Sequence, residues 1–276
     1  MVEQTKTHKG FKKTDIGEIP VDWSSVIIKQ NAKLINGRAY SLHEWEAHGT
    51  PVIRLQNLTG SGDNYYYSNL KLPDKQYCYF NDLLFMWSAT FGPIIWKGGK
   101  AIFHYHIWKI ETNNNLDKWY LFYVLEKITE NARKSSTNGG TMLHLTKRGM
   151  EKMLIPLPPT KEGQTAIATA LKDTDQLISS LEKLIAKKRL IKQGAMQELL
   201  RPKEDWVEKT IGDIAVVRDG THQTPRYVEQ GIPFYSVENV SANNFSETKF
   251  ISEEEHQFLT KNWKIEKGDI LMTRIG

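Results

Sequence analysis

The chain has 276 residues, of which 39% are hydrophobic and 25% charged, and its formal net charge is +5. This composition is typical of a globular protein with one or two domains, and no run of about 18 apolar residues is present to span a membrane. The first residues lack the apolar segment of a signal peptide, and the single cysteine, Cys78, excludes an internal disulfide framework, so we expect a cytoplasmic protein.

The charge is unevenly distributed along the chain. Residues 1–160 carry 20 Lys and Arg against 14 Asp and Glu, residues 161–203 carry 9 against 5, and residues 204–276 carry 8 against 13. A basic first part is typical of a protein that binds a polyanion, although ordinary surface charge gives the same balance.

The first 60 residues predict an arm followed by short elements. Residues 1–19 are polar and rich in lysine, and we expect a loosely attached arm. Residues 26–35 predict a strand or a short helix, and Asn36-Gly37 predicts a turn. Two apolar runs are typical of buried strands: residues 52–55 and residues 83–87.

A hairpin is predicted around a glycine pair. Residues 94–96 and 101–103 are apolar and flank the segment from Lys97 to Lys100, which has two glycines at its centre. Two cations beside exposed glycine amides suit contact with phosphate, and a solvated hairpin tip is the alternative.

A helix is predicted over residues 118–134, with Asp117 as its N-cap. A polar loop is predicted after it over residues 135–140, and residues 153–159 predict a short strand ended by prolines. The cations and hydroxyls at the end of this helix suit phosphate and base contacts, although a helix C-cap followed by a loop has the same composition.

Several segments supply residue types that contact DNA. The tyrosines at 65–67 follow the Gly- and Asn-containing residues 60–64, and they either stack on DNA or begin a strand. The segment 36–41 adds an arginine and a further tyrosine. The candidate DNA-contacting side chains are Arg38, Tyr40, Arg54, Tyr65, Tyr66, Lys97, Lys100, Arg133, Lys134, Ser136 and Asn138.

Residues 164–200 predict one long helix, which Arg201-Pro202 ends. At 1.5 Å per residue it would be about 55 Å long, too long for one small domain to cover, so its apolar stripe predicts a partner helix. The alternative is a helix that lies on its own domain. The candidate packing residues are Ile167, Leu171, Ile178, Leu181, Leu184, Ile185 and Ile191.

Segments of the first part recur after the long helix. The corresponding pairs are residues 23–27 with 206–210, 49–58 with 231–240, and 81–86 with 268–273. The loops at 36–41 and 218–224 differ although their flanks agree. Two readers of different sequences would show this pattern, and so would loop drift.

Sequence motifs of catalysis are missing from the chain. It contains no GxGxxG, GxxxxGK[ST], HExxH or GxSxG, and no Asn-Pro-Pro-Tyr/Phe motif of the kind that holds a target amine. His104 and His106 would share one strand face but lack further metal ligands, and we expect structural or DNA-facing histidines. Cys78 is expected to be packed. We therefore predict no metal, no cofactor and no catalytic residue.

Two segments carry a resemblance to a known family. The first is Ile155-Pro156-Leu157-Pro158-Pro159-Thr160-Lys161-Glu162-Gly163-Gln164, and the second is Lys192-Gln193-Gly194-Ala195-Met196-Gln197. With the Trp-centred starts of the two repeats, they make the whole chain resemble the specificity subunits of type I restriction–modification systems. Gly163 departs from the pattern, because the family commonly has a second glutamate there.

The resemblance implies a mixed α/β (α+β) fold in four parts. These are an N-terminal arm (1–19), a first target-recognition domain (20–160), a central spacer helix of coiled-coil type (161–201) and a partial second recognition domain (202–276). It also implies that each recognition domain reads half of a split double-stranded DNA target. The subunit would be non-catalytic and would recruit modification (methyltransferase) and restriction (motor and nuclease) subunits of a type I site-specific deoxyribonuclease and adenine-N6 methyltransferase complex.

Two rival hypotheses stay open. The first is a truncated specificity subunit that acts as a DNA-binding regulator, or as a homodimeric half-subunit joined through the central helix. The second is a non-catalytic coiled-coil scaffold protein. Salt-dependent binding to duplex DNA separates the scaffold from the others, and co-purification with a methyltransferase separates the specificity subunit from the regulator.

Overall fold

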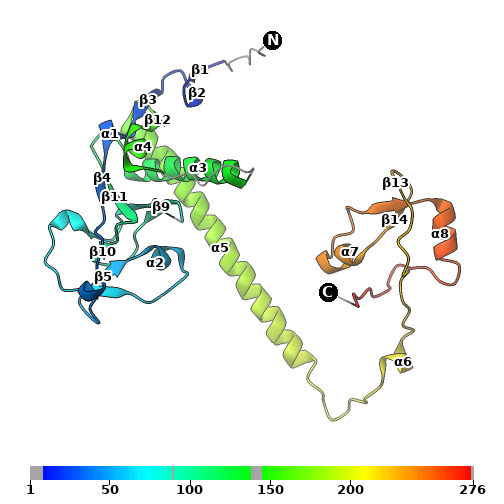
Figure 1. Cartoon of the computed structure of the whole chain (residues 1–276). Coiled ribbons are helices and arrows are strands. Elements are labelled where there is room, and N and C mark those ends of the chain that lie inside the picture. Colours follow the sequence, from blue (N-terminus) through cyan, green and yellow to red (C-terminus); the bar gives the residue numbers. More distant parts are fainter. Residues whose placement is uncertain (1–8, 89, 138–144, 275–276) are drawn as a thin grey trace. The chain divides into compact units, whose positions relative to one another are not determined.

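The computed structural model describes residues 9–88, 90–137 and 145–274. The chain divides into two compact units, Met1–Gln197 and Glu198–Gly276, and Figure 1 shows their elements. Strands and helices alternate in both units, so the predicted mixed α/β fold is confirmed. The predicted division into four parts stays a prediction.

Two four-stranded sheets form the frame of the first unit. One has the order β6-β5-β10-β7, built from Tyr66–Ser68, Thr50–Ile53, Ala101–Phe103 and Tyr77–Cys78. The other has the order β4-β11-β8-β9, built from Ala32–Asn36, Ile107–Thr112, Leu83–Met86 and Gly92–Ile95. Only β5 and β10 run parallel among the described pairs of these two sheets.

Alternation along the strands divides the core into two layers. Leu84 of β8 and Ile107 of β11 join a cluster that also holds Ile53 and Phe103 of the other sheet. Their neighbours Leu83 and Phe85, like Trp108 and Ile110, point to the opposite face of the second sheet. One core layer therefore lies between the sheets, and the other lies under the helices.

The helix α3 (Lys118–Thr137) covers that second face with Tyr120, Leu121 and Leu125, all of which are buried. Its predicted N-cap is confirmed, since the Asp117 Oδ1 atom accepts a hydrogen bond from the Tyr120 amide at 2.8 Å. The smaller elements of the first unit are β1 (Phe11–Thr14), β2 (Gly17–Pro20), β3 (Ser24–Ile27), α1 (Ile28–Asn31), α2 (Leu55–Thr59), α4 (Lys147–Lys152) and β12 (Leu154–Leu157), with single 3-10 turns at Leu42–Glu44 and Asp74–Gln76.

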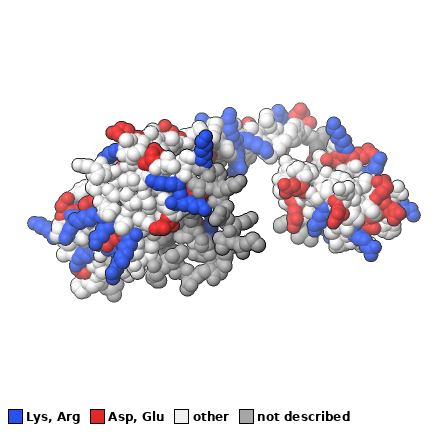
Figure 2. Space-filling view, turned by 90° about the horizontal axis from the view of Figure 1, so that it is seen from above, with Lys and Arg blue, Asp and Glu red and all other residues white. Residues whose placement is uncertain are grey.

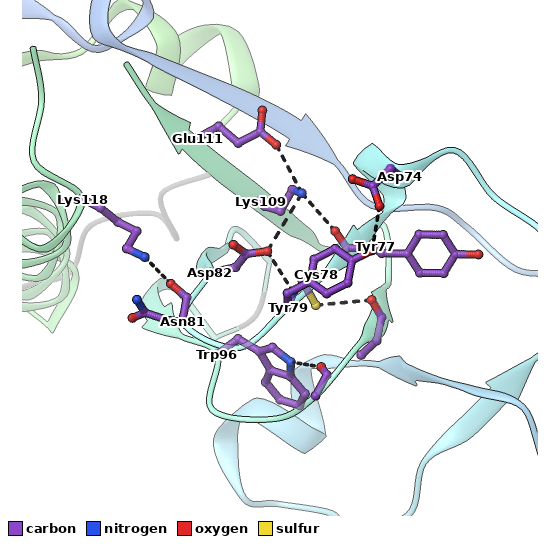
Figure 3. Close-up of polar contacts among 12 residues, drawn as sticks. Asp74, Tyr77, Cys78, Tyr79, Asn81, Asp82, Trp96, Lys109, Glu111 and Lys118 are labelled. Carbon is purple, nitrogen blue, oxygen red and sulfur yellow. Dashed lines mark hydrogen bonds and ion pairs between the residues drawn. The ribbon is translucent and has the colours of Figure 1, made fainter. Parts of the chain in front are cut away.

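A buried lysine ties the two sheets together (Figure 3). The Lys109 Nζ atom of β11 donates to the Tyr77 carbonyl of β7 at 3.0 Å and lies 3.2 Å from a Glu111 carboxylate oxygen. The Asp82 carboxylate stands 4.0 Å away and accepts a hydrogen bond from the Tyr79 amide. Because a charge so buried requires partners, this set fixes how one sheet lies on the other.

The long helix α5 (Lys161–Leu199) confirms the predicted element, and its first turns are anchored to the first unit. Gln164 is 1% exposed, and its side chain accepts from the Asp117 amide at 2.7 Å and donates to the Asn115 carbonyl at 3.0 Å. The Tyr123 hydroxyl donates to Asp175 at 2.7 Å. Gln164 of the family-like segment therefore joins the start of α5 to the start of α3.

The second unit repeats the frame of the first. Its elements are α6 (Ile211–Ile214), β13 (Tyr227–Val228), β14 (Ile232–Phe234), α7 (Val237–Ala242), β15 (Lys249–Ile251) and α8 (Glu253–Leu259), and its sheet has the antiparallel order β13-β15-β14. Asn57 after β5 and Asn239 after β14 hold the same bonds: each side-chain oxygen accepts from the amide three residues earlier, at 2.9 and 3.0 Å. The repeat seen in the sequence is thus a structural repeat.

The predicted hairpin over residues 94–103 is wrong. β9 pairs with β8 in one sheet and β10 pairs with β5 and β7 in the other, so the segment between them crosses from sheet to sheet. The Trp96 indole turns back over this segment and donates to the Gly99 carbonyl at 2.7 Å. A Cβ on Gly98 would lie 2.2 Å from that ring, so the glycine makes room for the tryptophan and not for a hairpin turn.

Four smaller expectations also change. Residues 26–35 form a strand, one helical turn and a second strand, and α3 continues to Thr137 where a loop was predicted from residue 135. Residues 11–20 of the predicted arm form a hairpin, β1 with β2. The predicted turn at Gly37 is a close approach: its amide donates to the Ile107 carbonyl at 3.0 Å, and a Cβ would lie 2.2 Å from the His104 carbonyl oxygen.

Candidate nucleic-acid interface

The parallel pair β5 and β10 brings three chain segments to one sheet edge. Arg54 directly follows β5, and His104 directly follows β10. The His104 amide donates to the Ile53 carbonyl at 2.9 Å, and the Arg38 amide donates to the Phe103 carbonyl at 3.2 Å. Since parallel strands end at the same edge, Arg38, Arg54 and His104 lie side by side.

Aromatic rings cover this edge in a continuous band. Tyr40 stacks on Trp45 with ring centroids 4.8 Å apart, and Trp45 contacts Tyr66 at 4.6 Å. His104 lies 6.4 Å from Trp45 and continues the band to its chain neighbours. We call the aromatic edge the set Arg38, Tyr40, Trp45, Arg54, Tyr66, Trp87, His104, Tyr105 and His106.

The far end of the band is a tryptophan with an adjoining pocket. The Trp87 ring lies 5.5 Å from His106, and its indole donates to the Tyr105 carbonyl at 2.8 Å. The pocket beside it is lined by Asn36, Gly37, Trp87, Tyr105, Trp108, Leu145, Thr146 and Lys147. Partly exposed rings with polar groups between them supply apolar contacts and hydrogen bonds to base edges.

The two arginines of the aromatic edge differ in their partners. The Arg38 guanidinium forms an ion pair with Glu44 and lies over the Tyr40 ring at 4.6 Å. The hydrogen bond from Arg38, together with those from the Ser41 amide and hydroxyl, lowers the pKa of Glu44 to about 2. Arg54 instead lies over the Tyr66 ring at 5.1 Å, and none of the ion pairs found among the described residues includes it.

The histidines of the aromatic edge are neutral at physiological pH. Burial lowers the pKa of His104 to about 4, and repulsion from the protonated form of His106 and from Arg54 adds to this. Burial and Arg54 also lower the pKa of His106. Each imidazole therefore offers one donor and one acceptor. The described residues contain no group of three or more His, Cys, Asp or Glu that could hold a metal ion.

The structure brings together only part of the candidate DNA-contacting set. Arg38, Tyr40, Arg54 and Tyr66 meet in the aromatic edge, whereas Tyr65 packs against the core between the sheets. Lys97 and Lys100 precede β10 and so lie toward its opposite end, where the Lys100 ammonium stands 4.0 Å from the centre of the Tyr77 ring.

The candidates at the end of α3 lie elsewhere. The Arg133 guanidinium donates to the Phe91 carbonyl, and Lys134 pairs with Glu130 at 2.6 Å. Nothing is described for the Ser136 side chain, and Asn138 falls outside the described residues. Contact of these four residues with DNA stays a prediction.

Sequence reasoning missed Trp45, Glu44 and Trp87. The partners of Trp45 lie five residues before it and 21 and 59 residues after it, so no local spacing could mark it. Cys78, by contrast, is buried as expected, and burial raises the pKa of its thiol to about 12.

The packing residues of the long helix separate into two groups. Ile167 contacts the core of the first unit. Exposure is 41 to 54% for the rest: Leu171, Ile178, Leu181, Leu184, Ile185 and Ile191. The first unit therefore leaves most of this apolar stripe uncovered.

Charge differs between the units in the way the sequence indicates. Lys and Arg are frequent on the visible face of the first unit, whereas acidic side chains are prominent on the second (Figure 2). The described helices include none that is long and apolar enough to cross a membrane.

Comparison with known proteins finds similar sequences among specificity subunits of type I restriction enzymes. Over 295 aligned residues the chain is 27% identical to the MjaVIII specificity subunit of a type I restriction enzyme from Methanocaldococcus jannaschii, covering 99% of this chain and 68% of that protein. It is 24% identical to the EcoBI specificity subunit from Escherichia coli, covering 92% and 60%.

A solved chain from work on assembly and conformational transition of the type I R-M system has a similar fold. Its TM-score is 0.52 at 18% identity, over 66% of this chain and 45% of that one. Residues 20–191 match the family described as type I restriction modification DNA specificity domain. The resemblance seen in the sequence is confirmed, and the chain belongs to this family of DNA specificity domains.

Proposed function

We propose that the first unit reads one half of a split duplex DNA target through the aromatic edge, within a type I restriction–modification enzyme. The observation that carries this proposal is the meeting of two arginines, two neutral imidazoles and five larger aromatic rings at one sheet edge of a DNA specificity domain. Such side chains supply hydrogen bonds and apolar contacts to base edges, while cations on phosphates set the register.

The subunit would act by binding alone. Specificity subunits are the non-catalytic members of type I systems, and we assign this chain the same role, with the modification and restriction subunits as its partners. No cofactor or metal enters the proposal. A cytoplasmic location stays a prediction, as do phosphate contacts at Lys97 and Lys100.

A selection experiment tests the proposal. The full chain is incubated at low salt with duplexes that have a randomised centre, and bound molecules are sequenced through successive rounds. We expect one enriched motif, with an affinity that falls as salt rises because counterions are released from phosphates. Enrichment of no sequence over the starting library would contradict the proposal.

A second function, that of a homodimeric half-subunit, is favoured by the uncovered stripe of α5. Leu181 and Ile185, each about half exposed, lie on one helical face. An antiparallel pairing of two copies would cover this stripe and place a first unit at each end, which suits an inverted-repeat target. The scaffold hypothesis shares the helix pairing but needs no DNA, so the selection experiment separates the two.

A further inference from the structure

The repeated frame presents different side chains at equivalent positions. In the first unit Val52 of β5 pairs with Tyr66 of β6, and in the second Phe234 of β14 pairs with Lys249 of β15. Two residues after these strand positions come Arg54 and Ser236, each at the N-cap of a short helix. The position of Arg54 therefore corresponds to Ser236.

The scaffold around this position is the same in both units. The side chain of Asn57 donates to the carbonyls of Gly62 and Asn64 at 3.2 and 3.0 Å. The side chain of Asn239 donates to the carbonyls of Asn244 and Glu247 at 3.1 and 2.8 Å. The side chain at the N-cap differs between the two units although the bonds around it are the same. This difference is expected where two copies of one frame bind different ligands.

Arginine is a poor choice for this position on structural grounds alone. Ser, Thr, Asp and Asn stabilise a helix N-cap, whereas an arginine side chain has no acceptor with which to cap the helix. The second unit has Ser236, whose hydroxyl bonds the Asn239 side chain at 3.2 Å. Residues that break a local stability rule concentrate at functional sites, so Arg54 has a role other than capping.

Rings hold the Arg54 guanidinium in place. Tyr66 lies under it at 5.1 Å, Trp45 contacts Tyr66, and Tyr40 stacks on Trp45. The neighbouring His104 and His106 are neutral, and the described residues offer Arg54 no ion pair. The planar fork is therefore pre-oriented and keeps its donors for a ligand.

We infer that Arg54 reads a guanine of the target half-site from the major groove. Its fork matches the O6 and N7 acceptors of guanine in a bidentate contact, the commonest specific contact between proteins and DNA. Arg38 does not take this role, because its Nη2 atom already pairs with Glu44 and its Nη1 atom is buried, which leaves no fork open to a ligand. This inference rests on the proposed function and names the base that one residue of the aromatic edge would select.

The selection from randomised duplexes tests it with three variants of the full chain. Arg54→Lys keeps the charge and removes the fork, and Arg54→Ser installs the residue of the second unit. Arg148→Lys makes the same exchange on the exposed side of α4 and serves as the control. We expect Arg54→Ser to lose preference at one G·C pair by about 5- to 150-fold, and Arg54→Lys to lose a smaller part of it at the same pair, with the rest of the motif unchanged.

The outcomes separate this inference from the proposed function. A wild type that enriches no motif overturns both. A wild-type motif that Arg54→Lys and Arg54→Ser retain at every position overturns the inference alone. Equal loss at all positions also overturns it, because a purely structural role predicts that result. Thermal unfolding completes the test: Arg54→Ser is expected to keep or raise the melting temperature, since serine is the better N-cap.

Discussion

At the scale of single residues, neighbouring charged side chains act on Arg38, His104 and His106 of the aromatic edge. Glu44 neutralises Arg38, and Arg54 favours the neutral form of His104 and His106. These residues lie far apart in the sequence and meet only because β5 and β10 end side by side. Arg38 and Arg54 were found from their residue type, but their different partners could be known only from the fold.

The lowered pKa of His104 predicts acid destabilisation. An unfolded histidine titrates near 6.5, and His104 in the fold titrates at about 4, so between these values the unfolded chain binds a proton that the fold does not. The free energy of unfolding should therefore fall as pH drops from about 6.5 to 4. Glu44, whose pKa is lowered from 4.5 to about 2, adds its own loss as the pH falls from about 4.5 to 2.

Urea unfolding followed by tryptophan fluorescence between pH 7 and pH 4 measures this effect. His104→Gln should reduce the pH dependence over that window, and the matched change at the exposed His48 should leave it as in the wild type. Equal slopes for His104→Gln and the wild type would show that His104 does not carry the effect.

At the scale of elements, local pattern predicted what local bonds determine. The cap at Asp117, the buried strand β8 and the long helix α5 follow from side chains within a few residues of one another. The prediction of a hairpin between β9 and β10 is wrong because glycines between apolar runs are also compatible with a segment that crosses from one sheet to the other. Which of the two forms is decided by Trp96 and by partner strands distant in the sequence.

The exposed stripe of α5 predicts self-association. Each buried Leu or Ile contributes on the order of 1.5–3 kcal/mol, so the six uncovered residues of the stripe can together exceed an association cost of about 4–15 kcal/mol. Sedimentation equilibrium at micromolar concentration should give a dimer for the wild type and a monomer for Leu181→Asp. Ser179→Asp adds the same charge on the opposite helical face and should remain dimeric. A wild type that sediments as a monomer would refute the pairing.

At the scale of the whole molecule, the two units share a frame but not a complete core. Ile28 and Leu83 are 1% and 0% exposed in the first unit, whereas their counterparts Ile211 and Ile270 are 64% and 95% exposed. In the first unit β11 lies between β4 and β8, and the described part of the second unit has no strand in that place. The repeat could be predicted from the sequence, because the matching motifs can be recognised whether or not their residues pack in a core. The exposure of the apolar side chains in the second unit could not be predicted, because it depends on which strands pair.

The chain is shorter than the relatives that it matches. It spans 68% and 60% of the two curated relatives and 45% of the solved chain. Family membership and fold are therefore established for these residues, while the split target and the partner subunits are proposals about the assembled enzyme.

Hydrogen exchange of the full chain, with and without the duplex that it selects, tests the central claim most directly. The account predicts slower amide exchange over residues 38–46, 54–67 and 103–106, which carry every residue of the aromatic edge except Trp87, with a duplex of scrambled sequence giving weaker protection. Unchanged exchange in these three segments under saturating selected duplex would contradict it.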